Sequence, residues 1–349
     1  MDAVKTKKDN SKMIMMLLKG RTFIVLIVLL IFFSIANPNF LSFSTLTMLA
    51  KHVALYGILA IGMTFVIITS GIDLSVGSVV GLAGMIAGGM IQEGVTLTFA
   101  GVTLYFSVPV IVLFTLLLGC VIGLINGVIV TKLSVAPFIA TLGTMYICRG
   151  LASLRSKGAT FSNIAGNEAL GNVGIKALGS SIAGIPVGAI LLLVFAVVGA
   201  YLLRNIPFGW HVQAVGGNNR AAKLSGVNVD RITILVYILS GFCAAMVGLI
   251  NTAQLAAAHP ASGDSWEMNA IAATVLGGTS MSGGSGTILG TIVGAFVIGV
   301  INDGMTMCGV SEFWQKVIRG LVIILAVIID QAQRKLEAKM ALQVRNETN

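Results

Sequence analysis

Long apolar runs that carry almost no charge are the feature that most limits what this chain can fold into. Of its 349 residues, 56% are hydrophobic and only 10% are charged. A water-soluble domain is not expected to carry so little charge. We therefore take the lipid bilayer as the solvent of this chain. Backbone polar groups in hydrocarbon must bond to one another, which leaves helices or a closed barrel. The runs do not alternate between polar and apolar residues, so the sequence predicts an all-α, polytopic membrane protein.

A helix needs about 20 apolar residues to cross the hydrocarbon core, and the sequence contains about ten runs that approach this length. They cover roughly 22–36, 46–70, 75–92, 108–130, 137–155, 186–203, 232–257, 267–279, 286–302 and 316–330. The first run is short and is expected to extend back through Met13–Leu18. The apolar stretch Val95–Phe106 is too short to cross and is interpreted as a half-buried outer connection.

The distribution of Lys and Arg predicts the orientation of these spans. An even number of crossings places both termini on one side, and the positive-inside rule makes that side the cytoplasm. In this arrangement fifteen Lys and Arg residues fall on the inner side and seven on the outer side. The predicted parts are a cytoplasmic tail 1–21, a transmembrane domain 22–330 with a cytoplasmic loop 204–231, and a cytoplasmic tail 331–349. The formal net charge of +9 is therefore explained by orientation, and no nucleic-acid partner is expected.

A polar, basic stretch, Gly216–Val229, lies between two of the apolar blocks. Asn218 and Asn219 are residue types that cap a helix by accepting from free backbone N–H groups. The residues Arg220–Leu224 favour a short helix, and Gly226 can adopt the left-handed conformation that ends it. A short capped helix between two membrane halves suits contact with a partner outside the bilayer. The alternative interpretation is an ordinary solvated loop.

Three motifs resemble one family. Ala221 and Ala222, followed four residues later by Gly226, resemble the coupling-helix motif of ABC importer permeases. Arg220 stands where the usual motif has an acid and the apolar-Pro ending is missing, as in the branch that imports simple sugars. The stretches Thr69–Ser78 (TSGIDLSVGS) and Leu276–Gly284 (LGGTSMSGG) also resemble that ribose-type branch. The resemblance extends from about residue 37 to residue 330.

The resemblance implies a permease subunit of an ATP-driven monosaccharide importer in the bacterial cytoplasmic membrane. It implies three partners besides the lipid bilayer: a second permease chain, most simply an identical one, a cytoplasmic ABC ATPase and an extracytoplasmic sugar-binding protein. The chain itself would bind no cofactor and catalyse no reaction, because ATP and magnesium would be held by the ATPase. The residues implied in coupling to the ATPase are Asn218, Arg220, Ala221, Ala222, Leu224 and Gly226.

Polar residues at helix breaks or within apolar runs are candidates for a gate or a translocation path. They are Asp73, Ser75, Gly77, Asn126, Thr141, Asn251, Ser282 and Asn302. For Asp73 the alternative role is a helix cap that accepts from the N–H groups of Ser75 and Val76. For the others the alternative is an interhelical hydrogen bond, worth roughly 0.6 kcal/mol on average.

Other functional classes have less support. The stretch Gly283–Thr287 lacks the lysine of a P-loop, and the three histidines are too scattered to form a metal set. A stand-alone secondary sugar carrier remains the main alternative, and a non-transporting scaffold is a third. The acidic residues lie near the predicted span ends, which argues against a proton-coupled carrier. Val121–Asn126 (VIGLIN) echoes Val297–Asn302 (VIGVIN) on spans of opposite direction, which suggests an inverted repeat.

Overall fold

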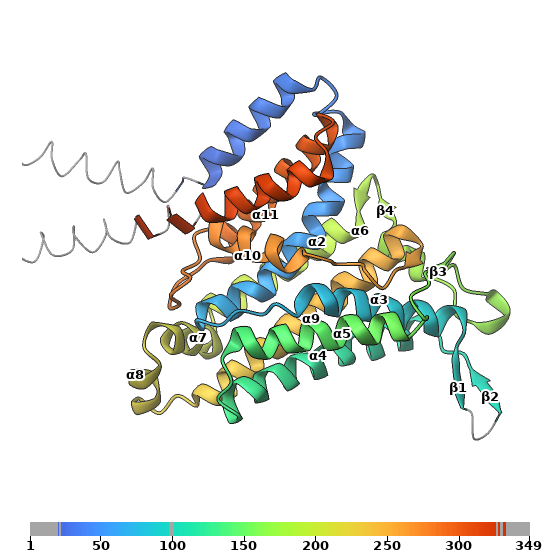
Figure 1. The fold of residues 1–349 in the computed structure, drawn as a ribbon, viewed down its shortest axis with the longest axis horizontal. Coiled ribbons are helices and arrows are strands. Elements are labelled where there is room, and N and C mark those ends of the chain that lie inside the picture. The colour runs from blue at the N-terminus through green and yellow to red at the C-terminus, as the bar shows by residue number, and fades with distance from the viewer. Residues whose placement is uncertain (1–19, 21, 98–100, 326, 329–330, 333–349) are drawn as a thin grey trace, which may run out of the picture.

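The protein is a bundle of helices whose two ends carry different elements (Figure 1). The structure, a computed structural model, describes residues 20, 22–97, 101–325, 327–328 and 331–332. Five of the described helices are long and apolar enough to cross a membrane: α2 (Phe43–Ile68), α4 (Val108–Lys132), α6 (Val187–Arg204), α9 (Val229–Leu255) and α11 (Ile288–Met307). They coincide with predicted spans. The predicted tails 1–21 and 331–349 and the extension Met13–Leu18 lie almost entirely outside the described residues.

Shorter helices accompany these five. They are Thr22–Ala36, α3 (Val76–Gln92), α5 (Pro137–Leu154), α7 (Pro207–Gly217), α8 (Asn219–Leu224), α10 (Trp266–Leu276) and a last helix over 312–325. The helices α7 and α8 lie at one end of the bundle, and the short strands lie at the other end (Figure 1). The hydroxyl of Thr22 donates to the carbonyl of Leu276, which ties the start of the first helix to the end of α10.

The end opposite α8 carries three small two-stranded sheets. The predicted connection over Val95–Phe106 is a hairpin, in which β1 (Val95–Leu97) pairs antiparallel with β2 (Val102–Leu104). The long loop after α5 contains β3 (Phe161–Ser162), which pairs with β6 (Ala257–Ala258) after α9. It also contains the 3-10 helices η1 (Glu168–Leu170) and η2 (Ile175–Gly179) and the pair β4 (Ser181–Ile182) and β5 (Ile185–Pro186).

Small residues set how closely α4 and α9 pack. A side-chain carbon on Gly119 would overlap the carbonyl of Gly241, and one on Gly241 would overlap the carbonyl of Gly119. Further along the same pair, Gly123 lies against the backbone of Tyr237. Helices that share the same apolar solvent gain little from a hydrophobic effect, so close backbone packing of this kind holds them together.

The predicted crossing 267–279 differs from a full transmembrane helix. The helix α10 has eleven residues, and at 1.5 Å per residue it spans roughly 16 Å, about half of a 30 Å core. The preceding residues form a non-helical segment that packs along α3, with Ala258 against Gly88 and the carbonyl of Gly263 against Gly77. The segment is a series of turns, in which the N–H groups of Ser262, Asp264 and Trp266 donate to the carbonyls of His259, Ala261 and Gly263.

Arg149 of α5 satisfies part of this non-helical backbone. Its Nη1 donates to the carbonyls of Pro260 and Ser262 at 2.7 and 2.8 Å. Irregular backbone at membrane depth is stable only where protein or a water-filled cavity surrounds it. The positive charge of Arg149, which fits poorly with a simple outer-loop location, is therefore a structural part of this crossing.

Candidate coupling and translocation site

The predicted short helix in the central loop is present and has a complete set of caps. The side-chain oxygen of Asn218 accepts from the N–H of Ala221 at 3.0 Å. At the other end Gly226 has φ +85°, and the N–H groups of Gly226 and Val227 donate to the carbonyls of Lys223 and Ala222. These two bonds form a Schellman stop, which requires a left-handed residue at the position of Gly226. The helix is therefore fixed at both ends by its own sequence.

The faces of α8 differ in what they contact. The side chain of Ala222 is buried, whereas Leu224 is 90% exposed. Arg220 and Ala221 are also exposed. Leu224 therefore takes no part in this chain's core, and its side chain is accessible on the outer face of α8.

The loop that carries α8 is joined directly to both glycine- and serine-rich helix breaks. A side-chain carbon on Gly216, near the end of α7, would overlap the carbonyl of Ile68 at the end of α2. The same carbonyl accepts from the N–H of Gly284 at 2.9 Å. The hydroxyl of Ser70 donates to the carbonyl of Ser282 at 3.0 Å. Three segments that are distant in sequence thus meet at one point, which we call the inner junction (Ile68–Ser70, Gly216 and Ser282–Gly284).

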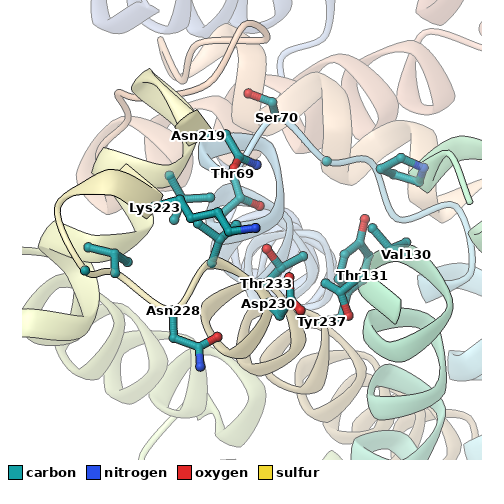
Figure 2. A pocket seen from close by; sticks show the side chains of 16 residues that line it. Thr69, Ser70, Val130, Thr131, Asn219, Lys223, Asn228, Asp230, Thr233 and Tyr237 are labelled. Atoms are coloured by element: carbon teal, nitrogen blue, oxygen red, sulfur yellow. The ribbon is translucent and has the colours of Figure 1, made fainter. Parts of the chain in front are cut away.

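A cavity of about 710 Å³ lies beside the inner junction, between α8 and the adjoining ends of α2, α4 and α9. Figure 2 shows Asn219 and Lys223 on one side, Thr69 and Ser70 above, and Thr131, Thr233 and Tyr237 opposite. Nearby, Lys132 of α4 pairs with Asp230 of α9 at 2.6 Å. The cavity separates α8 from the ends of these helices.

A buried polar network surrounds the first helix break. The carboxylate of Asp73 accepts from the N–H and hydroxyl of Ser75 at 3.0 and 2.6 Å and from the hydroxyl of Ser240 at 2.8 Å. The amide of Asn126 donates to Ser75 at 2.9 Å and accepts from Thr144 at 2.6 Å. An unpaired buried carboxylate would be costly, and three donors offset this cost. The network links the break to α4, α5 and α9.

The structure brings some of the predicted path residues together and leaves others apart. The hydroxyl of Thr141 donates to the carbonyl of Ile72 at 3.3 Å, so it belongs to the same region as Asp73. Gly77 lies against the carbonyl of Gly263 and the carboxylate of Glu267. Asn251 and Asn302 lie roughly 33 and 21 Å along α9 and α11 from the starts of those helices, at the opposite end of the bundle. They do not take part in the Asp73 network.

Several contacts at this site are not evident from sequence. The interpretation of Asp73 as a cap on Ser75 and Val76 names the first donor, but the structure replaces the second with Ser75 Oγ and Ser240. Gly216 and Ser70 fall within the stretches singled out from sequence but were not among the candidate site residues, although both lie at the inner junction. The glycine pairs at 216–217 and 283–284 were the available signal, since close backbone approach requires glycine.

Comparison with known proteins gives consistent matches. A family model described as "Branched-chain amino acid transport system / permease component" matches residues 45–327. The ribose import permease protein RbsC of Bacillus subtilis (strain 168) is 42% identical over 310 residues, which cover 88% of this chain and 91% of that protein. RbsC of Haemophilus influenzae is 38% identical over 329 residues, which cover 94% and 97%. The galactose/methyl galactoside import permease protein MglC of Escherichia coli (strain K12) is 38% identical over 328 residues, which cover 92% of this chain and 96% of that protein. No solved structure matches.

Proposed function

Because the chain belongs to the family of branched-chain amino acid transport system permease components, we propose that it is the membrane subunit of an ATP-driven monosaccharide importer. The relatives' names supply the substrate class, since they are import permeases for ribose and for galactose or methyl galactoside. The chain is a non-catalytic transport subunit. The main alternative from sequence was a stand-alone carrier, but these relatives are named as import permeases.

The observation that carries the mechanism is the inner junction. The exposed face of α8 receives the movement of an ATPase that binds and hydrolyses ATP with magnesium. Since Gly216 lies directly on the carbonyl of Ile68, this movement passes from the loop to the end of α2 and to the break at Ser282–Gly284.

The buried network around Asp73 couples this junction to the membrane interior. Asp73 and Ser75 lie a few residues beyond Ser70 and bind α9 and α4 through Ser240 and Asn126. A change at the junction therefore reaches helices on both sides of the break. This arrangement supports an alternating-access role for the break, in which the network holds one of two packings.

The partners follow from the same proposal. A second copy of the chain completes the path, a cytoplasmic ATPase binds α8, and a sugar-binding protein docks at the end that carries the short sheets. The assembly lies in the bacterial cytoplasmic membrane with both termini and α8 in the cytoplasm. This orientation is supported by the count over the whole sequence, in which fifteen Lys and Arg residues, many of them in the two tails, fall on the inner side and seven on the outer side.

The direct test changes Leu224 to Asp and measures the complex as it is assembled in its host. The tagged chain is purified from membranes, the retained ATPase subunit is quantified, and ATP-dependent ribose uptake is measured in vesicles. Leu224→Asp is expected to lose most of the ATPase and the uptake, because a carboxylate replaces an apolar contact. Leu170→Asp, an exposed leucine at the opposite end, is the matched control for retention of the ATPase. Retention of the ATPase by Leu224→Asp, or sugar accumulation by the chain alone without ATP, would contradict the proposal.

A further inference from the structure

The non-helical segment before α10 reaches the middle of the membrane. Ser240, which binds Asp73, lies eleven residues after the start of α9, or roughly 17 Å along a helix of roughly 40 Å. Gly77 is one turn beyond Asp73, and the carbonyl of Gly263 lies against Gly77. The segment therefore descends from the short sheets to the depth of the Asp73 network.

One face of this segment is buried and the other is exposed. Pro260, Gly263 and Glu267 are buried against α3 and its neighbours. Ala261, Asp264 and Ser265 are exposed, and Asp264 and Ser265 are polar. We call this second face the polar face.

Lipid is an unsuitable neighbour for the polar face. An aspartate at the centre of a membrane helix costs about 2.5–3.5 kcal/mol on insertion scales, and acids at this depth face protein or water. Exposed non-helical backbone in hydrocarbon is costlier still. Elsewhere in the bundle the exposed surface is apolar, as at Leu117 and Val121 of α4 and Val197 of α6. The apolar surface of α4 and α6 is therefore suited to lipid, whereas the polar face is suited to water.

We propose that the polar face, with Ala261, Asp264 and Ser265, lines the water-filled path through which the sugar crosses. The inference rests on the proposed function and adds to it the residues of the path. A hydroxyl-rich cargo needs groups that exchange hydrogen bonds readily, and a carboxylate and a hydroxyl at mid-membrane supply them. Trp266 follows directly, with its ring 5.5 Å from that of Tyr56 and nearly perpendicular to it, which adds an aromatic wall beside the polar groups.

The position of the polar face also fits alternating access. The helix α3 begins at Val76 and runs toward the short sheets, whereas α10 begins at Trp266 and runs toward the inner junction. Both helices therefore start near the same depth, next to Gly77 and Gly263. Substrate sites built from interrupted helices near the bilayer midplane are a general plan of transporters.

Water accessibility tests the proposal independently of which sugar is carried. In a chain whose four cysteines are replaced by serine or alanine, Ser265→Cys and Ala261→Cys are compared with Val197→Cys, an exposed apolar position on α6. A charged, water-soluble thiol reagent is applied to the assembled complex in membranes. Both polar-face cysteines are expected to react at least tenfold faster than Val197→Cys. Equal rates at Ser265→Cys and Val197→Cys would overturn the proposal.

A second measurement separates the path from a face that is merely wet. The complex is trapped with ATP and vanadate, and labelling is repeated. The rate at Ser265→Cys is expected to change at least threefold, because the path opens to opposite sides in the two states. Fast labelling that is the same in both states would overturn the assignment. If the labelling results hold but the complex imports no monosaccharide, the proposed cargo fails and the aqueous face stands.

Asp264→Asn gives a third readout in the same complex. The substitution keeps the size of the side chain and its position on the exposed face. Sugar uptake is expected to fall while the retained ATPase and the melting temperature stay unchanged, because only the path is altered. Ser162→Ala, at an exposed polar residue of β3, is the matched control for the melting temperature and for the retained ATPase. Normal uptake by Asp264→Asn together with slow labelling of Ser265→Cys would refute the path role.

Discussion

At the scale of single residues, Gly226 and Asp73 show how far local sequence rules extend. The rule that a glycine ends a helix in the left-handed conformation predicted the stop after α8, and Gly226 has φ +85°. The rule for helix caps predicted that Asp73 accepts from Ser75, which it does at 3.0 Å. It could not predict the bond from Ser240, because that residue lies 167 positions away and is brought to Asp73 by helix packing.

Replacing Gly226 by Val should decouple ATP hydrolysis from uptake in a folded, inserted protein. A left-handed conformation costs a residue with a Cβ roughly 1–2 kcal/mol, and valine is among the least tolerant. The free space around Gly226 means that the effect is on the backbone rather than on packing. Gly226→Asn is the matched control, since asparagine tolerates this conformation. Uptake and ATPase rates are measured together, and normal import by Gly226→Val would count against a docking role for the helix stop.

Replacing Asp73 distinguishes a structural acceptor from a necessary charge. Asp73→Ala leaves Ser75 and Ser240 without their acceptor, and each buried unsatisfied group costs about 1–3 kcal/mol. Asp73→Asn keeps one oxygen for Ser75 and offers an N–H to the oxygen of Ser240. We expect near-normal transport and melting temperature for Asp73→Asn and a clear loss of both for Asp73→Ala. A stable Asp73→Asn variant without transport would show instead that the charge itself is required.

At the scale of elements, the apolar runs located the helices but not their depth. The predicted spans 108–130 and 137–155 agree with α4 and α5 within two residues at each boundary. The run 267–279 looked like a crossing, yet α10 covers only part of it, and the non-helical segment before α10 completes the passage. The glycines at 77, 81, 84 and 88 form a stripe on α3 that allows close approach, but a stripe does not specify what approaches.

The contact between Gly216 and Ile68 should be essential for coupling. Gly216→Ala places a carbon on the carbonyl of Ile68, so α7 and the end of α2 must separate, at a cost of about 1–3 kcal/mol. Gly217→Ala is a matched control in the same helix, because a carbon there meets nothing within 4 Å. We expect the first variant to lower both the melting temperature and sugar-stimulated ATP hydrolysis, and the second to leave both unchanged. If both variants had the same melting temperature and the same rate of sugar-stimulated ATP hydrolysis, the inner junction would have no part in coupling.

Arg149 should be needed to hold the non-helical half of the eighth predicted crossing. Arg149→Leu removes two charge-assisted hydrogen bonds and leaves the carbonyls of Pro260 and Ser262 without that donor. Hydrogen bonds to charged groups contribute about 1.5–3 kcal/mol each, so a large fall in melting temperature is expected in detergent. Arg149→Lys keeps a donor, so its melting temperature should fall less. Equal melting of Arg149→Leu and the unchanged protein would show that other groups satisfy this backbone.

At the scale of the whole molecule, hydropathy does not report burial. In the most apolar stretch of α4, the candidate span with the highest mean hydropathy, 28% of the residues are buried, whereas in α2 the share is 83%. Lipid and protein interior are equally apolar, so an apolar sequence cannot show which neighbour a helix has. The central place of α2 was therefore not predictable from composition. The orientation of the bundle does depend on a sequence signal, namely the distribution of Lys and Arg.

That orientation can be tested on two exposed positions at opposite ends of the bundle. In a cysteine-free chain, Lys223→Cys on α8 and Leu170→Cys in η1 are treated with a membrane-impermeant maleimide. In intact cells only Leu170→Cys should react, and in inverted vesicles only Lys223→Cys, because an ATPase can reach α8 only from the cytoplasm. The unlabelled position in each preparation is the control for leakiness, and detergent should expose both. Labelling of Lys223→Cys from outside the cell would place α8 beyond the reach of any cytoplasmic motor and end the coupling model.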